Sequence, residues 1–142
     1  MTSKHRLATR VLASLAVALA VFGTPGAQPR DKRISLDEGR ELASEIVKVH
    51  NPGPGVSLTS SPRGFDPDFY FFCATWPNPT GSPVIGYFAV NPWTGDVWNA
   101  DDCEHLTSKS VQKTQADIRK RFHFKREEYA KLREKMPLCA RE

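Results

Sequence analysis

Residues 84–99 read VIGYFAVNPWTGDVWN, and this stretch predicts a β-hairpin. Two runs suited to strands, 84–90 and 97–99, flank a short segment of turn-forming residues. Pro92 presets the backbone φ angle of a turn, and Gly95 can adopt the left-handed conformation that ends it. We therefore expect two antiparallel strands joined by a tight turn.

The residues before the hairpin also have the character of strands. Phe69 to Trp76 is a strong strand with aromatic residues on both faces, which favours a central strand covered on each side. Val56 to Thr59 is a candidate for a short additional strand. Pro77 to Pro83 holds three prolines and a glycine, so we expect a loop there.

A helix is predicted before the strands. Ser35 can cap its first turn while Glu38 reaches back to the Ser35 amide, which is a capping box. The segment from Asn51 to Gly55, rich in proline and glycine, ends the helix. The apolar stripe of this helix has helical spacing and consists of Leu42, Ala43, Ile46 and Val49.

Two helices are predicted after the hairpin. The first runs from about Thr107 to Phe122, and the second starts near Arg126 and ends before Pro137. The apolar faces are formed by Val111, Gln115, Ile118 and Phe122 in the first, and by Tyr129, Leu132 and Met136 in the second. The expected fold class is α+β, with an N-terminal helix, a three- to four-stranded antiparallel sheet and a C-terminal helical hairpin, in the order α-β-β-β-α-α.

Residues 35–99 resemble the small PepSY-type domains of exported bacterial proteins. The resemblance lies in the helix, the strands and above all the hairpin, which reads Tyr87-Phe88-Ala89-Val90 and then Thr94-Gly95-Asp96-Val97. It implies a domain without catalytic residues, of a kind associated with inhibiting or guiding extracellular peptidases. The cysteines and the C-terminal helical hairpin depart from that pattern, and no functional residue is carried over.

The N-terminus has the composition of a secretory signal peptide. A basic segment, Lys4 to Arg10, precedes an apolar run from Val11 to Phe22 and then small residues up to Ala27. We expect residues 1–27 to be a signal peptide, 28–34 a flexible lead-in and 35–142 a single α+β domain. The alternative is an uncleaved anchor with the domain still outside. The expected location is secreted or periplasmic.

The net charge of +4 conceals a contrast along the chain. Residues 28–104 carry 6 basic and 11 acidic side chains, whereas residues 105–142 carry 11 basic and 5 acidic ones. Export argues against nucleic acid as the partner of the basic tail. An acidic protein or an anionic envelope polymer is the better candidate, and a merely solvated helix face is the alternative.

Three cysteines occur in a chain that we expect to be exported, where disulfides form. Cys103 follows the last predicted strand and Cys139 follows the last helix, so a bond between them would tie the helical hairpin to the sheet. The pairing of Cys73 with Cys103 is the alternative. We expect Cys73 to be a buried, inert thiol.

No motif predicts catalysis. A Gly-x-Ser-x-Gly sequence is absent, and prolines in 51–55 remove amides that a phosphate-binding loop would need. The consecutive residues 101–105, DDCEH, match a calcium loop poorly because they lack the glycine of its sharp bend. We expect no cofactor, no metal ion and no catalytic residue; a hydrolase built on paired acids is the alternative.

The candidate partner-binding residues are Trp93, at the expected hairpin tip, and the basic residues Arg119, Lys120 and Arg121. Exposed tryptophan is a common anchor of protein interfaces; folding of Trp93 onto the sheet is the alternative. The leading hypothesis is a non-catalytic binding protein that inhibits or modulates an extracytoplasmic enzyme. The second is an envelope-associated structural protein whose basic C-terminal helices bind anionic polymer.

Overall fold

The computed structural model describes residues 32–61, 66–77 and 80–139. These residues form three helices and one antiparallel sheet of five strands. The strands neighbour one another in chain order and are β1 (Ser57–Ser60), β2 (Tyr70–Thr75), β3 (Val84–Val90), β4 (Val97–Asn99) and β5 (Glu104–Leu106). The predicted signal peptide, residues 1–27, lies outside the described residues.

The predicted α+β class is confirmed, but the order α-β-β-β-α-α is wrong because it has too few strands. The sequence predicts no strand at β5, which lies between the predicted hairpin and the helix that follows it. It pairs with β4 through Val97 and Leu106, yet two of its three residues are exposed and polar. A strand so short and so polar has no alternating apolar pattern by which sequence could reveal it. The hairpin of β3 and β4 has the predicted bounds.

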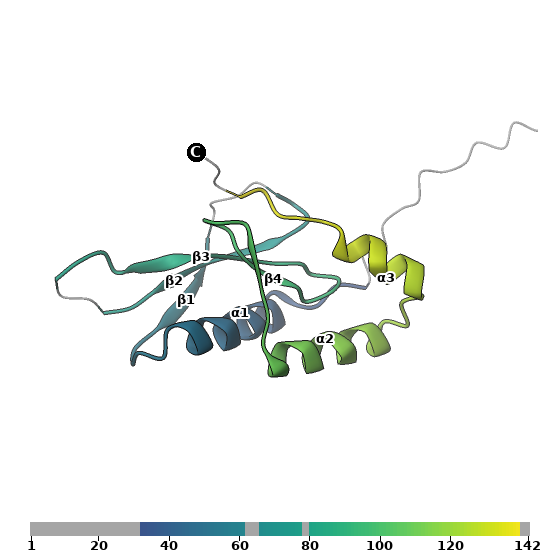
Figure 1. The fold of residues 1–142 in the computed structure, drawn as a ribbon, viewed down its shortest axis with the longest axis horizontal. Coiled ribbons are helices and arrows are strands. Elements are labelled where there is room, and N and C mark those ends of the chain that lie inside the picture. Colours follow the sequence, from purple (N-terminus) through teal and green to yellow (C-terminus); the bar gives the residue numbers. More distant parts are fainter. Residues whose placement is uncertain (1–31, 62–65, 78–79, 140–142) are drawn as a thin grey trace, which may run out of the picture.

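Two helices cover one face of the sheet: α1 (Leu36–His50) and α2 (Lys109–Arg121) (Figure 1). The predicted capping box starts α1, since the Ser35 hydroxyl accepts from the Glu38 amide and the Glu38 carboxylate accepts from the Ser35 amide. The main core lies between these helices and the sheet; its largest fully buried side chains include Phe72, Ile46, Val47, Val90 and Val111. Burial of these apolar groups is the main force that holds the layers together.

The aromatic residues of β2 point to both sides of the sheet, as predicted. Phe72 belongs to the core beneath the helices, whereas Phe71 packs with Ala89 and Ala100 in a second cluster. The chain after α3 (Arg126–Arg133) runs back along the sheet on the side opposite α1 and α2 (Figure 1). β2 is therefore an inner strand with apolar residues buried on both faces.

Helix α3 ends at Arg133, a turn earlier than predicted. Met136 is 54 % exposed and takes no part in the apolar face expected of it. The chain leaves the helix because its next residues bind elsewhere. Lys135 Nζ lies 2.7 Å from Asp68 Oδ2, and Cys139 forms a disulfide with Cys103. The predicted pairing is thus present, and Cys73 is a free, half-buried thiol on β2.

The expected lead-in, residues 28–34, is packed at its C-terminal end rather than flexible. Ile34 is 1 % exposed, and its amide donates to the Pro92 carbonyl at 2.8 Å. The Tyr70 hydroxyl donates to the Ile34 carbonyl at 2.9 Å. This apolar residue is held because it fills space between α1 and the turn of the hairpin. Residues 28–31 lie outside the described residues.

No helix within the described ranges has both the length and the apolar content needed to cross a bilayer.

Candidate functional site

Trp93 is not an exposed anchor. Its side chain is 0 % exposed and packs with Phe124 and Leu132 in a cluster between the hairpin turn and α3. The Arg33 guanidinium lies 4.3 Å from the centre of the indole, and Lys135 Nζ lies 4.6 Å from it. The expected exposure of Trp93 is therefore wrong, and the ring packs against Phe124 and Leu132 rather than onto the sheet. The residues that cover the ring come from both ends of the described chain, which local sequence could not indicate.

The hairpin turn is held by its own side chains. The Asn91 Oδ1 atom accepts from the amides of Trp93 and Thr94, and the Gly95 amide donates to the Asn91 carbonyl at 2.8 Å. Gly95 adopts a φ of +72°, the left-handed conformation predicted for it. The Asn91 side-chain amide also donates to the Leu132 carbonyl at 2.8 Å, which fastens α3 to the turn.

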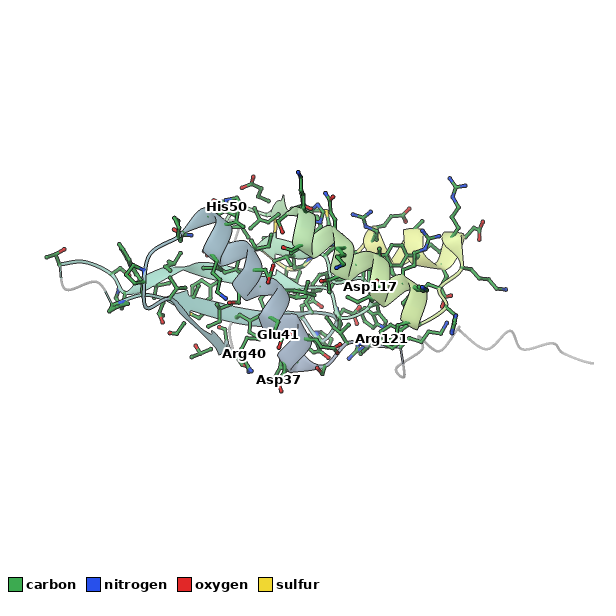
Figure 2. The ribbon with its side chains drawn as sticks, turned by 90° about the horizontal axis from the view of Figure 1, so that it is seen from below. Asp37, Arg40, Glu41, His50, Asp117 and Arg121 are labelled. Atoms are coloured by element: carbon green, nitrogen blue, oxygen red, sulfur yellow. A yellow bond between two sulfur atoms is a disulfide. The ribbon has the colours of Figure 1, made fainter. Side chains whose placement is uncertain are left out.

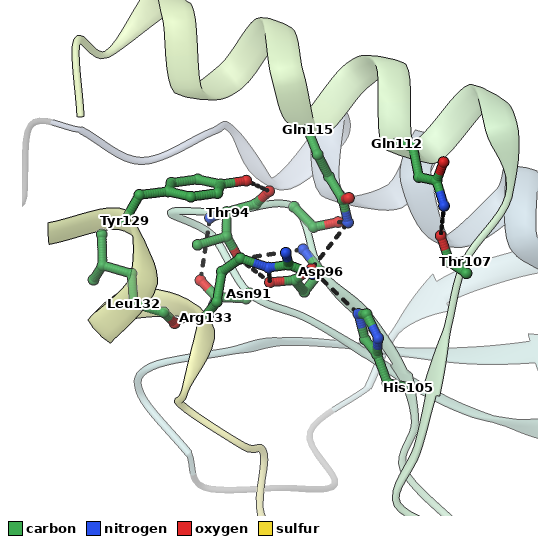
Figure 3. A network of polar contacts seen from close by, with 11 residues as sticks. Asn91, Thr94, Asp96, His105, Thr107, Gln112, Gln115, Tyr129, Leu132 and Arg133 are labelled. Atoms are coloured by element: carbon green, nitrogen blue, oxygen red, sulfur yellow. Dashed lines mark hydrogen bonds and ion pairs between the residues drawn. The ribbon is translucent and has the colours of Figure 1, made fainter. Parts of the chain in front are cut away.

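Asp96 follows this turn and is the centre of a buried polar network (Figure 3). Its side chain is 3 % exposed and accepts two hydrogen bonds of 3.1 Å from Arg133 of α3. Gln115 of α2 donates to it at 3.1 Å, and the Thr94 hydroxyl donates at 2.8 Å. His105 Nε2 of β5 lies 3.2 Å from the same carboxylate. A buried carboxylate needs such compensation, and this network joins α2, α3 and β5 to the hairpin.

A basic groove lies beside this network, between α2 and α3. Its volume is about 680 Å³, and it is lined by Gln112, Gln115, Ala116, Arg119, Lys120, His123, Phe124, Lys125, Tyr129 and Arg133. Two of the predicted partner-binding residues, Arg119 and Lys120, are among them. Arg119 lies over the Tyr129 ring, with its guanidinium carbon 5.3 Å from the ring centre. None of the described residues that line this groove is a carboxylate.

Arg121 faces away from the basic groove, although it is adjacent in sequence to Lys120. Its guanidinium lies 2.6 Å from Glu38 Oε1 of α1. It lines an acidic groove of about 310 Å³ between α1 and α2, together with Ile34, Glu38, Glu41, Leu42, Glu45, Thr114, Asp117 and Ile118. Figure 2 shows Glu41 and Asp117 on the two neighbouring helices. The three predicted basic residues therefore serve two different surfaces.

The ion pairs at the two grooves shift the pKa values of their members. The hydrogen bond from Arg121 lowers the pKa of Glu38 below its ordinary value, although burial opposes the shift. The hydrogen bond to Asp96 raises the pKa of Arg133, so this guanidinium keeps its charge. Burial, followed by the charge of Asp96, raises the pKa of the Tyr129 phenol.

The side chains of residues 101–103 each make a different structural contact and do not converge on one site. Asp101 accepts from the Tyr87 amide at 3.0 Å, Asp102 accepts from the Asn99 side chain at 2.9 Å, and Cys103 is in the disulfide. Within the described ranges, no three His, Cys, Asp or Glu side chains gather as metal ligands would.

Sequence reasoning missed both the acidic groove and the Asp96 network. Glu41, Glu45 and Asp117 look like ordinary solvated helix positions, and only the packing of α1 beside α2 gathers them. Asp96 follows Thr-Gly in the turn, which gives no sign that Arg133, 37 residues later, binds it.

The fold and these surfaces define a small α+β protein with two charged grooves of opposite sign on its helical side. No family model matches the chain, and no curated protein matches it. The chain is similar to one in the solved structure of a type VI secretion system effector–immunity complex from Pseudomonas protegens. The two are 19% identical with a TM-score of 0.58, over 73% of this chain and 89% of the other. This likeness shows a shared fold.

Proposed function

We propose that this chain is an exported, non-catalytic binding protein that inhibits a partner enzyme outside the cytoplasm. The observation that carries the proposal is the fold shared with a chain from an effector–immunity complex. In this proposal the partner is an effector-type enzyme, and the present chain neutralises it by occupying its surface. The charged grooves supply the kind of surface that steers and selects a protein partner.

Two features support an extracytoplasmic location. The disulfide between Cys103 and Cys139 suits an oxidising compartment. The composition of residues 1–27 is typical of an export signal.

The proposal is tested by capture followed by an inhibition assay. The disulfide-bonded chain, immobilised, is exposed to extracytoplasmic extract of the source organism, and retained proteins are identified by mass spectrometry. Each retained enzyme is then purified and its activity is titrated with the chain. We expect loss of activity that is complete near one equivalent. Full activity of every retained enzyme at saturating chain would overturn the proposal, and the matrix without the immobilised chain is the control for capture.

The basic groove favours a second candidate function, the binding of an anionic envelope polymer. Arg119 and Lys120 line a groove in which no described lining residue is a carboxylate, and such a groove would attract a polyanion. Binding of heparin, as a probe polymer, would then weaken steeply with salt and with the double change Arg119→Ala and Lys120→Ala. Arg121→Ala should weaken heparin binding less, because Arg121 is already paired with Glu38. Salt-independent binding would exclude this candidate.

A further inference from the structure

The exposed side of α2 separates two grooves of opposite charge. The basic groove lies toward α3, and the acidic groove lies toward α1. We propose that one protein surface docks across α2, placing an acidic segment in the basic groove and a basic segment in the acidic groove. This inference rests on the proposed function, for which it names the docking face and the chemistry of the partner.

The positive charges of the basic groove are available to a partner. Within the part of the chain that the structure describes, Arg119, Lys120 and Lys125 form no ion pair. Arg133 is bound to Asp96 but its side chain is 48 % exposed, so its guanidinium also reaches solvent. Tyr129 adds an aromatic surface beneath Arg119. Such a surface fits carboxylates on a folded segment.

The acidic groove offers free carboxylates above an apolar floor. Among the described residues, Glu41, Glu45 and Asp117 make no ion pair, whereas Glu38 is neutralised by Arg121. Leu42 also lines the groove and is 3 % exposed. A lysine or arginine of a partner could lay its alkyl stem on such a floor and place its charge among the carboxylates.

The adjacency of the grooves favours a protein over a polyanion. A polyanion held by Arg119 and Lys120 would pass close to Glu41 and Asp117, because one helix, about 10 Å across, separates the two grooves. The carboxylates would repel it. A protein surface can present both signs at this spacing, and mismatched charges then exclude wrong partners. The solved structure that shares the fold is itself a complex between proteins.

The test uses two charge reversals with matched controls. The first variant, Arg119→Glu with Lys120→Glu, reverses the basic groove. Its control, Lys109→Glu with Lys113→Glu, makes the same charge change on exposed α2 residues outside both grooves. The second variant, Glu41→Lys with Asp117→Lys, reverses the acidic groove. Its control, Glu127→Lys with Glu134→Lys, changes exposed residues of α3 and its C-cap. Circular dichroism checks that each variant is folded.

The probes are hexaglutamate and hexalysine peptides, mapped by amide chemical shifts of the ¹⁵N-labelled chain, together with heparin. We expect hexaglutamate to shift amides of residues 119–133 and hexalysine to shift amides of residues 38–45 and 114–117. Reversal of the basic groove should weaken hexaglutamate binding about tenfold, and reversal of the acidic groove should weaken hexalysine binding about tenfold. Each control variant should change the same affinity less than about twofold. Heparin should bind the second variant more tightly than the wild-type chain. The proposal would be overturned if the control variants weakened peptide binding as much as the reversals do. It would also be overturned if heparin bound the wild-type chain tightly and bound the second variant with the same affinity.

The captured enzyme separates this inference from the proposed function. If both reversals weaken inhibition while the controls do not, the docking face is supported. If the wild-type chain inhibits and both reversals inhibit equally well, the docking face is wrong and the function stands. If the peptides map to the two grooves but no captured enzyme is inhibited, the inhibitory function is wrong and the charged face stands.

Discussion

Arg133 holds the buried carboxylate of Asp96 through two hydrogen bonds of 3.1 Å, from Nε to Oδ2 and from Nη2 to Oδ1. Asp96 lies at the end of the hairpin turn, directly before β4, and Arg133 is the last residue of α3. The pair therefore fixes α3 against the turn. Because α3 forms one wall of the basic groove, the shape of that groove depends on this ion pair, in which the carboxylate is buried and Arg133 itself lines the groove.

We expect Arg133→Met to lower the free energy of unfolding by about 2 kcal/mol. Removing one member of a fully buried pair costs about 3–5 kcal/mol, and the loss is smaller here because the Arg133 side chain is half exposed. Urea denaturation followed by circular dichroism measures the change. The double variant with Asp96→Asn should recover part of the loss, since it removes the uncompensated charge. If the free energy of unfolding of Arg133→Met lies within about 0.5 kcal/mol of the wild-type value, as for an ordinary surface substitution, the ion pair does not fix α3.

Gly95→Ala is expected to be strongly destabilising for two reasons that act together. The residue has a φ of +72°, which costs about 1 kcal/mol or more for a residue with a Cβ atom. The added Cβ would lie 2.8 Å from Ile118 Cδ1 and 3.1 Å from Leu42 Cδ1. The total loss should be about 2–4 kcal/mol.

Gly53→Ala is the matched control for this change. Its Cβ would meet only Trp76, at an ordinary distance of 3.9 Å, and Gly53 does not have a positive φ. Thermal unfolding of both variants compares them directly. A Gly95→Ala melting temperature equal to that of Gly53→Ala would show that the turn can relax.

The fold could be predicted where local signals agree. The capping box at Ser35 and the strand pairing of Val90 with Val97 each depend on residues near in sequence, and both are present. β5 could not be predicted, because backbone pairing with β4 rather than an apolar pattern defines it. Likewise α3 ends early because distant residues, Asp68 and Cys103, hold the chain that follows it.

The candidate site was predictable only in its charge. The basic run in α2 is evident in the sequence, but Lys120 and Arg121 point to different sides of the helix and line different grooves. The burial of Trp93 could not be predicted, because the exposure of a hairpin tip depends on which distant residues lie over it, here Arg33 and Lys135. The resemblance to PepSY-type domains stays a prediction.

Loss of the disulfide should destabilise the fold without releasing the segment that follows α3 from its contact with Asp68. Its cysteines are 36 residues apart, so the chain-entropy model gives about 4 kcal/mol for the Cys103→Ala and Cys139→Ala double variant. This segment would still be held by the ion pair between Lys135 and Asp68, in which Nζ lies 2.7 Å from Oδ2. Urea denaturation measures the loss, and Cys73→Ala, which removes a free thiol, should change stability by about 1 kcal/mol or less. Equal stability of the double variant and Cys73→Ala would refute a stabilising role for the bond.

The ion pair between Glu38 and Arg121 should make stability depend on acid pH. Arg121 lowers the pKa of Glu38 in the folded chain below its ordinary value of 4.5. The stabilisation from this pair is therefore present above that ordinary value and is lost as the pH falls through the folded-state pKa. Arg121→Ala should raise the pKa of Glu38, and it should flatten the dependence of stability on pH in this range. Carboxyl NMR titration of Glu38 measures the first effect, and Lys120→Ala, which faces the other groove, should leave the pKa of Glu38 unchanged. If Glu38 titrates at the same pH with and without Arg121, the salt bridge across the acidic groove does not form in solution.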